Sequence, residues 1–202
     1  MKTLATHINE ALKIGKNLSK FSTHSCQPKT KEELQEIINE RISDEGPECD
    51  LNDIDVSLID DMSYLFSQSN FNGNISEWDV SNVIDMRAMF YKSPFNGNIS
   101  KWDVGKVDDM SDMFYGAKFN QDISKWDVSN VEDMSWMFYQ SDFNGNISKW
   151  NVSKVTNMKN MFVYSKFNQD ISNWKINKDC ANNDMFYSCP IKEKFKPKSL
   201  QK

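Results

Sequence analysis

The stretch QDISKWDVSNVEDMSWMF, residues 121–138, decides the fold because close copies of it recur along the chain. Its Trp126 belongs to a series with a spacing of 24 residues, and its isoleucine, methionines and phenylalanine belong to series with the same spacing. The tryptophans of the series are Trp78, Trp102, Trp126, Trp150 and Trp174. A fixed period shared by several residue types is the signature of a repeat protein.

The apolar positions within one unit indicate how that unit folds. They run Ile75, Trp78, Val80, Val83, Met86, Met89, Phe90 and Phe95. The opening steps of three, two and three match the spacing of a leucine-rich repeat. Positions 78 and 80 predict one face of a short strand over about residues 75–80. The spacing of 86, 89 and 90 predicts a short helix or 3₁₀ turn from Asp85, with the capping position repeated at Asp109, Asp133 and Asn157.

A single unit of this kind cannot bury its own apolar side, so the units must stack. We therefore predict an α/β repeat solenoid: a leucine-rich-repeat-like, right-handed stack of strand–short helix units, with a parallel sheet on one wall and an N-terminal cap helix. In this prediction the tryptophans form a buried ladder. The rival interpretation places them on an exposed aromatic rail for sugars.

The chain divides into four parts. Residues 1–29 are an N-terminal segment with a candidate short helix and a polar linker, and 30–50 are a cap helix and its connection, opened by a capping box at Thr30 and Glu33. Residues 51–191 hold about six 24-residue repeats, of which the first and last are degenerate. Residues 192–202 are a Lys-rich tail that we expect to be solvated.

Composition limits the class of partner. The net charge is −5, with no cluster of Lys and Arg for phosphate contacts, so we expect no nucleic-acid partner. No apolar stretch is long enough to span a bilayer, so we expect no membrane insertion. The N-terminus does not read as a signal peptide, which favours the cytoplasm and four reduced cysteines.

Residues for catalysis are scarce. The two histidines, His7 and His24, both lie in the N-terminal segment, and no Ser/His/Asp or Cys/His arrangement can be recovered. No Gly-rich phosphate loop appears among the seven glycines. We predict a non-enzymatic protein with no catalytic residues, no cofactor and no metal.

Candidate partner-binding residues lie on the predicted strand wall. If Trp78 and Val80 point inward, their neighbours point outward and form two rows. The residues singled out are Glu77, Lys101, Lys125 and Lys149 in one row, and Asp79, Asp103 and Asp127 in the next. The alternative is that the two rows neutralise each other and only keep the wall soluble.

Trp136 is the eighth candidate because it breaks the repeat. Other units carry Tyr64, Ala88, Asp112, Asn160 or Asp184 at this position. If it is exposed, Trp136 is the best single hot-spot candidate, since tryptophan is favoured at interface centres. If it tucks against a neighbouring turn, it is packing only.

The repeated string N-I-S-K-W-D-V-S-N-V-x-D-M-S-x-M-F resembles the BspA-like leucine-rich-repeat family of bacterial surface and surface-like proteins. The similarity covers about residues 30–190 and includes the entry segment TKEELQEIINERI. The resemblance implies a bacterial or phage protein with a binding role such as adhesion, and makes the cell surface an alternative location. It brings no catalytic residues.

The function predicted from these observations is protein–protein interaction through the strand wall, with an unidentified protein partner. Two alternatives remain: a solenoid that binds a glycan or another polymer, and a self-assembling structural component. Self-association is compatible with the prediction because the end of an imperfectly capped stack can pair with another.

Overall fold

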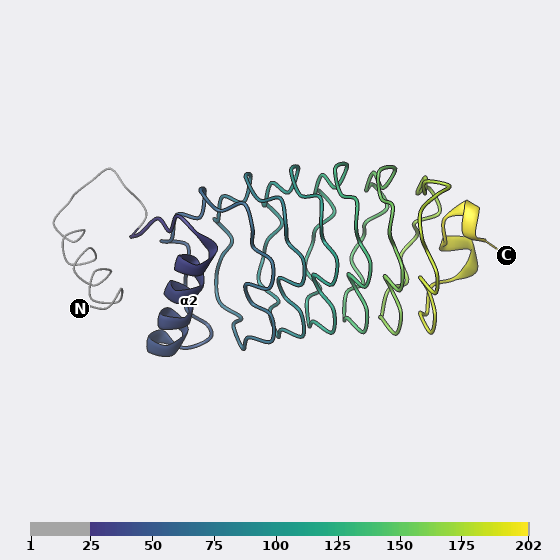
Figure 1. The fold of residues 1–202 in the computed structure, drawn as a ribbon. Helices are drawn as coiled ribbons and strands as arrows, with labels where there is room; N and C mark the ends of the chain where they lie inside the picture. Colours follow the sequence, from purple (N-terminus) through teal and green to yellow (C-terminus); the bar gives the residue numbers. More distant parts are fainter. Residues whose placement is uncertain (1–24, 202) are drawn as a thin grey trace.

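The computed structural model describes residues 25–201, and its helices lie at the two ends of the molecule (Figure 1). The α-helix α2 spans Lys31–Glu45, and two 3₁₀ helices, η1 (Glu193–Phe195) and η2 (Lys198–Leu200), lie near the C-terminus. Between the two ends the chain runs as a row of stacked coils, from blue to yellow in Figure 1. The predicted N-terminal helix, His7 and His24 fall outside the described residues.

The predicted α/β solenoid with a parallel sheet is wrong. The part of the chain that the structure describes has one α-helix and no β-strand, and its parallel pairing is limited to isolated bridges. The longest column of bridges joins Asp61, Asp85, Asp109, Asp133, Asn157 and Ala181. Neighbouring coils are therefore joined without strands, and no wall of strands forms in this part of the chain.

The predicted strand over residues 75–80 is a turn. The Asn74 Oδ1 atom accepts a hydrogen bond from the Ser76 backbone N–H at 3.2 Å, and the Trp78 N–H donates to the Ile75 carbonyl at 3.3 Å. An asparagine that bonds to the backbone two residues on competes with extended structure. Trp78 and Val80 are both buried as predicted, but a turn leads into them.

The predicted short helix after Asp85 is also absent. Every second backbone N–H from Met86 to Lys92 donates to a carbonyl 23 residues further along, over 2.7–2.9 Å. Ala88 and Lys92 have φ angles of 53° and 51°, in the left-handed region. A helix would need these N–H groups for its own carbonyls and negative φ throughout. The segment is a series of tight turns bonded to the next coil.

The repeated apolar residues form continuous ladders inside the stack. The five tryptophans of the series are each 4% exposed, and each indole Nε1–H donates to a backbone carbonyl 27 residues earlier at 2.9–3.2 Å. The phenylalanines of one series, Phe66, Phe90, Phe114, Phe138, Phe162 and Phe186, stack with 5.6–5.7 Å between ring centroids. The tryptophan ladder is therefore structural, and the exposed-rail interpretation is wrong.

A polar ladder joins the return loops. The Asn72 Oδ1 atom accepts the backbone N–H of Asn96, and the same bond repeats from coil to coil as far as the N–H of Lys192, over 2.8–3.1 Å. This bonding explains why the loops from Phe71 to Phe167 carry asparagine after the phenylalanine, whether the next residues are Gly-Asn or Gln-Asp. Stacked asparagines of this kind supply one hydrogen bond to each added coil.

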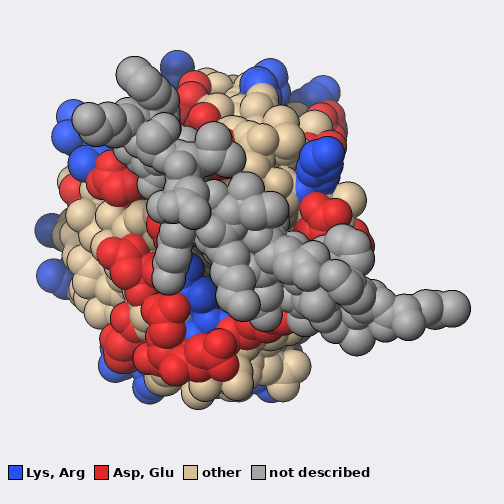
Figure 2. Space-filling model, turned by 90° about the vertical axis from the view of Figure 1, so that its left-hand side faces the viewer, with Lys and Arg blue, Asp and Glu red and all other residues tan. Residues whose placement is uncertain are grey.

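Helix α2 closes the N-terminal end of the stack. Thr30 caps it by accepting the Glu33 N–H at 3.2 Å, and Leu34 and Ile38 are buried against the first coil. Figure 2, which looks onto this end, shows Asp and Glu gathered on the surface. The exposed face of α2 carries Glu32, Glu36, Glu40 and Asp44. Like charges four residues apart oppose helix formation, so packing and side-chain anchors must hold α2 in place.

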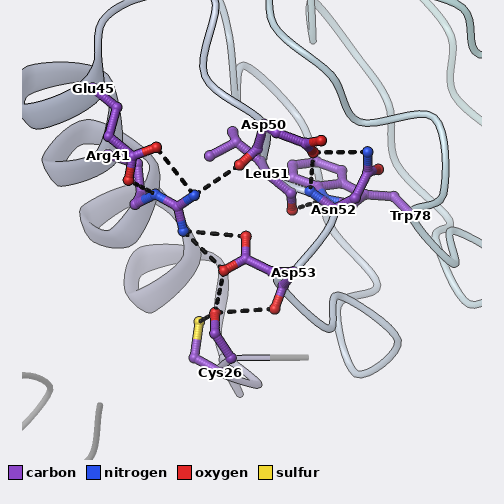
Figure 3. Close-up of polar contacts among 9 residues, drawn as sticks. Cys26, Arg41, Glu45, Asp50, Leu51, Asn52, Asp53 and Trp78 are labelled. Atoms are coloured by element: carbon purple, nitrogen blue, oxygen red, sulfur yellow. Dashed lines mark hydrogen bonds and ion pairs between the residues drawn. The ribbon is translucent and has the colours of Figure 1, made fainter. Parts of the chain in front are cut away.

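Arg41 is the main polar anchor of α2 (Figure 3). Its guanidinium donates to both carboxylate oxygens of Asp53 at 3.0–3.1 Å and to the Asp50 carbonyl at 2.8 Å, and its Nε lies 2.6 Å from Glu45. Burial by itself would raise the pKa of Asp53, but hydrogen bonds from Ser25 and Arg41 hold this pKa below its usual value. The helix is thus tied to the first coil by charge-assisted bonds.

The C-terminal segment closes the other end, where we expected a solvated tail. The Ile171 N–H donates to the Phe195 carbonyl at 2.9 Å, and Phe195 and Leu200 pack against the core. Lys196 is held by Glu193 at 2.6 Å. The lysines of this segment therefore surround apolar residues that cover the last coil.

Candidate functional site

The predicted rows of charged residues lie on the surface of the stack. All of Glu77, Lys101, Lys125, Lys149, Asp79, Asp103 and Asp127 are exposed. Lys101 Nζ forms an ion pair with Glu77 at 3.1 Å, and both side chains are largely solvated. Lys125 and Lys149 line a hollow of about 350 Å³ together with Ser124 and Asn146. The structure thus brings the basic row together, although no strand carries it.

The aspartates of the second row have a local structural role. Asp79, Asp103 and Asp127 each accept the backbone N–H two residues on, at 3.0–3.1 Å. Hydrogen bonds from the Ser129 hydroxyl and backbone lower the pKa of Asp127. Each carboxylate already accepts a hydrogen bond that stabilises its own turn. The aspartates are therefore less available to a partner than the lysines beside them.

A column of carboxylates runs along the bridged residues. Asp61, Asp85, Asp109 and Asp133 lie in successive coils, and each accepts the backbone N–H two residues on at 2.7 Å. Lys31 pairs with Asp61 at 3.1 Å, and the Asn157 amide donates to Asp133 at 2.9 Å. Burial, together with the charges of Asp109 and Asp61, raises the pKa of Asp85.

Replacing Asp85 with asparagine is expected to stabilise the stack near neutral pH. A carboxyl group whose pKa is raised on folding contributes stability below its unfolded pKa and loses it as pH rises through the folded pKa. The introduced asparagine would keep the bond to the Arg87 N–H, as Asn157 does for Lys159 at 3.2 Å, without the repulsion. We expect a gain of about 0.5 kcal/mol near pH 7 and none near pH 3. Urea unfolding at both pH values measures it, and a loss of stability near pH 7 would contradict the expectation.

A second face of the stack carries aromatic side chains that are partly or largely exposed. We name Tyr91, Tyr115, Trp136, Tyr139, Tyr164 and Tyr187 the aromatic stripe. The rings of Tyr91, Tyr115 and Tyr139 stack at 4.6–4.7 Å, and Tyr164 meets Tyr139 and Tyr187 edge-on at 5.9 and 5.6 Å. Tyr164 and Tyr187 are 50% and 58% exposed, which makes this end of the stripe the most accessible part.

Trp136 lies within the aromatic stripe and is half-buried. Its ring is 4.9 Å from that of Tyr139 and 6.2 Å from that of Tyr115. With Tyr139, Asn160, Val163, Asp184 and Tyr187 it lines a pocket of about 240 Å³. Trp136 therefore contacts two rings of the stripe and also borders the pocket.

Sequence reasoning missed two residues of this pocket region. Tyr187 follows the 24-residue spacing of Tyr91, Tyr115 and Tyr139, but Tyr164 falls at a position held by Lys92, Gly116 or Gln140 elsewhere. Asp184 stands in the register of Trp136, two coils further on. The available signal was departure from the repeat, which singled out Trp136 and could have singled out Tyr164.

The described residues offer free thiols but no cluster of metal ligands. Among residues 25–201, no cluster of three or more His, Cys, Asp or Glu side chains could hold a metal ion. Cys26, Cys49, Cys180 and Cys189 are free thiols whose pKa values are raised by burial. No helix in this part of the chain combines the length and apolar composition needed to cross a bilayer.

These features define a repeat protein of stacked 24-residue coils with a buried aromatic core and two distinct exposed faces. The family model described as "Mycoplasma protein of unknown function, DUF285" matches residues 34–142 and 117–197. The chain therefore belongs to the DUF285 family. No curated protein matches the chain, and no solved structure matches it. The family match is compatible with a repeat protein of surface-protein-like type, and it does not confirm the BspA-like leucine-rich-repeat assignment.

Proposed function

We propose that this chain is a non-enzymatic protein-binding module that contacts its partner through the aromatic stripe. The observation that carries the proposal is the pocket bordered by Trp136, Tyr139 and Tyr187 at the most exposed end of the stripe. Tryptophan and tyrosine are the side chains most enriched at interface hot spots. Exposed aromatic residues gathered on one face are typical of an interaction surface.

The fold itself does not require an indole at position 136. The residues in this register share a left-handed φ, which is 53° at Ala88, 58° at Asp112, 59° at Trp136 and 57° at Asn160. A left-handed backbone favours glycine or asparagine and is uncommon for a bulky residue. Since smaller residues make the same turn in other coils, the indole is better explained by contact with a partner than by the backbone.

The basic row is the second candidate face. Lys125 and Lys149 border an open hollow, whereas Lys101 is paired with Glu77. Fully exposed charges contribute little to affinity and mostly influence the rate of association. We also infer, from the repeated motif, a relationship to BspA-like proteins, which is compatible with binding through either face.

The test compares partner capture by three baits. Wild type, Trp136→Asn and the Lys101→Glu/Lys125→Glu/Lys149→Glu variant are immobilised after circular dichroism shows that all three are folded. Trp136→Asn copies the residue that Asn160 supplies in the next coil, so the turn should be preserved. We expect that wild type and the lysine variant both capture the same partner protein and that Trp136→Asn does not.

Other outcomes of the capture experiment distinguish the alternatives. Loss from the lysine variant alone would move the interface to the basic row. Capture of no protein by any bait would contradict the proposed function. A glycan is the second candidate ligand because exposed tyrosine rings can pack on sugars, and a glycan array with the same three proteins tests it.

A further inference from the structure

The pocket beside Trp136 combines aromatic rings with a carboxylate. Three of its lining residues, Trp136, Tyr139 and Tyr187, present rings, and Asp184 is exposed at its edge. The Asp184 side chain forms no hydrogen bond or ion pair with the described residues. At about 240 Å³ the pocket is smaller than the cavities that hold cofactors or drug-sized ligands, which suits it to a single side chain.

Elsewhere on the same face the chain covers its tyrosine rings with its own cations. Arg87 lies over Tyr64 at 5.4 Å from the ring centroid. Lys92 lies over Tyr91 and Tyr115 at 5.2 and 5.8 Å. A cation over an aromatic face is attracted by the negative potential of the ring. These contacts show which chemistry the surface rings of this protein attract.

The pocket lacks such a cation within the described residues. Lys92 reaches the ring of Tyr115 in the next coil. Gly116 occupies the Lys92 position one coil further on and has no side chain, so it places no cation over Tyr139. Gln140 holds this register on the following coil, and Tyr164 holds it one coil further on, with its ring 5.6 Å from that of Tyr187. Lys159, the equivalent of Arg87, lies over none of these rings. The pocket therefore has the rings and a carboxylate but no positive charge between them.

We infer that the pocket receives the positively charged side chain of an arginine or lysine from the partner polypeptide. The rings of Trp136 and Tyr139 contact the cation, and the Asp184 carboxylate pairs with it. This inference rests on the proposed protein-binding function and names the chemical group that the aromatic stripe selects. An acidic or neutral side chain would leave the charge of Asp184 uncompensated.

The test uses a small probe instead of the unidentified partner. N-acetylarginine amide is titrated into the full chain, with N-acetylcitrulline amide as a neutral probe of nearly the same shape. The indole N–H signal of Trp136 is followed by NMR and assigned by its absence from Trp136→Asn. We expect a saturable shift with the arginine probe, a dissociation constant of about 1–10 mM, and no saturable shift with citrulline.

Two variants test the role of the carboxylate. Asp184→Asn should weaken binding of the arginine probe about 2- to 5-fold, as expected for a solvated charge pair. Asp112→Asn, in the same register three coils away, should bind like wild type. Equal shifts with arginine and citrulline, or an unchanged affinity in Asp184→Asn, would overturn the inference. If the probe experiment fails but Trp136→Asn still fails to capture a protein that wild type captures, the inference is wrong and the proposed function is retained.

Discussion

Replacing Trp126 with alanine is expected to lower the free energy of unfolding by about 3 to 5 kcal/mol, the usual cost of truncating a buried tryptophan. The indole is 4% exposed, and its N–H donates to the Ile99 carbonyl at 3.1 Å. Alanine leaves a cavity in the ladder and removes one of the two hydrogen bonds that the Ile99 carbonyl accepts, the other being the Trp102 N–H at 3.2 Å. Trp126 lies in a central coil, so both neighbouring coils lose contacts.

Urea unfolding followed by circular dichroism measures the effect. Trp136→Asn is the matched control, because it removes the one tryptophan that lies outside the 24-residue series and should change the free energy of unfolding by less than about 1 kcal/mol. A Trp126→Ala protein as stable as this control would show that the tryptophan ladder does not hold the stack together.

Replacing Gly73 with alanine is expected to cost about 2 to 3 kcal/mol, whereas the same change at Gly145 should cost about 1 kcal/mol or less. A Cβ atom at Gly73 would lie 2.0 Å from the Cys49 carbonyl oxygen, a backbone atom that cannot move without shifting the first coil. At Gly145 the nearest atoms, at 2.7 and 2.8 Å, belong to the Phe143 ring, which can adjust. Gln121 and Gln169 occupy the Gly145 register in other coils.

Thermal and urea unfolding of the two variants, side by side, give the comparison. The difference in free energy of unfolding between the two variants tests whether the backbone at Gly73 is packed more closely than the backbone at Gly145. The close approach of the Cys49 carbonyl to Gly73 implies that it is. Equal destabilisation at Gly73 and Gly145 would contradict the close approach of the Cys49 carbonyl.

Part of the candidate site could be predicted from the sequence because it depends on exceptions to a period. The repeat placed Glu77 and Lys101 outside the core, where the structure exposes them, and it marked Trp136 as a departure from its register, which the structure finds half-buried. The pocket that Trp136 shares with Asp184 and Tyr187 could not be predicted in this way. Their proximity depends on how closely the coils stack and on which side each ring turns.

The local conformation could not be predicted because apolar spacing does not reveal where backbone N–H groups donate. The spacing of Met86, Met89 and Phe90 is compatible with a helix, but their N–H groups bond partly across coils, and Ala88 takes a left-handed φ that its side chain does not favour. Tertiary contacts thus override local preference.

The sequence by itself determined that the chain is a stack of 24-residue units, and it determined which residues form the core and which break the pattern. Only stacking can bury several apolar series that share one period. Only the tertiary structure decided that the units are tight turns instead of strand and helix, and that Trp136 shares a pocket with a carboxylate from two coils further along. The physical reason is that hydrogen bonds and ring contacts between coils depend on the distance and register of the coils. Both of these are determined jointly by residues that lie far apart in the chain.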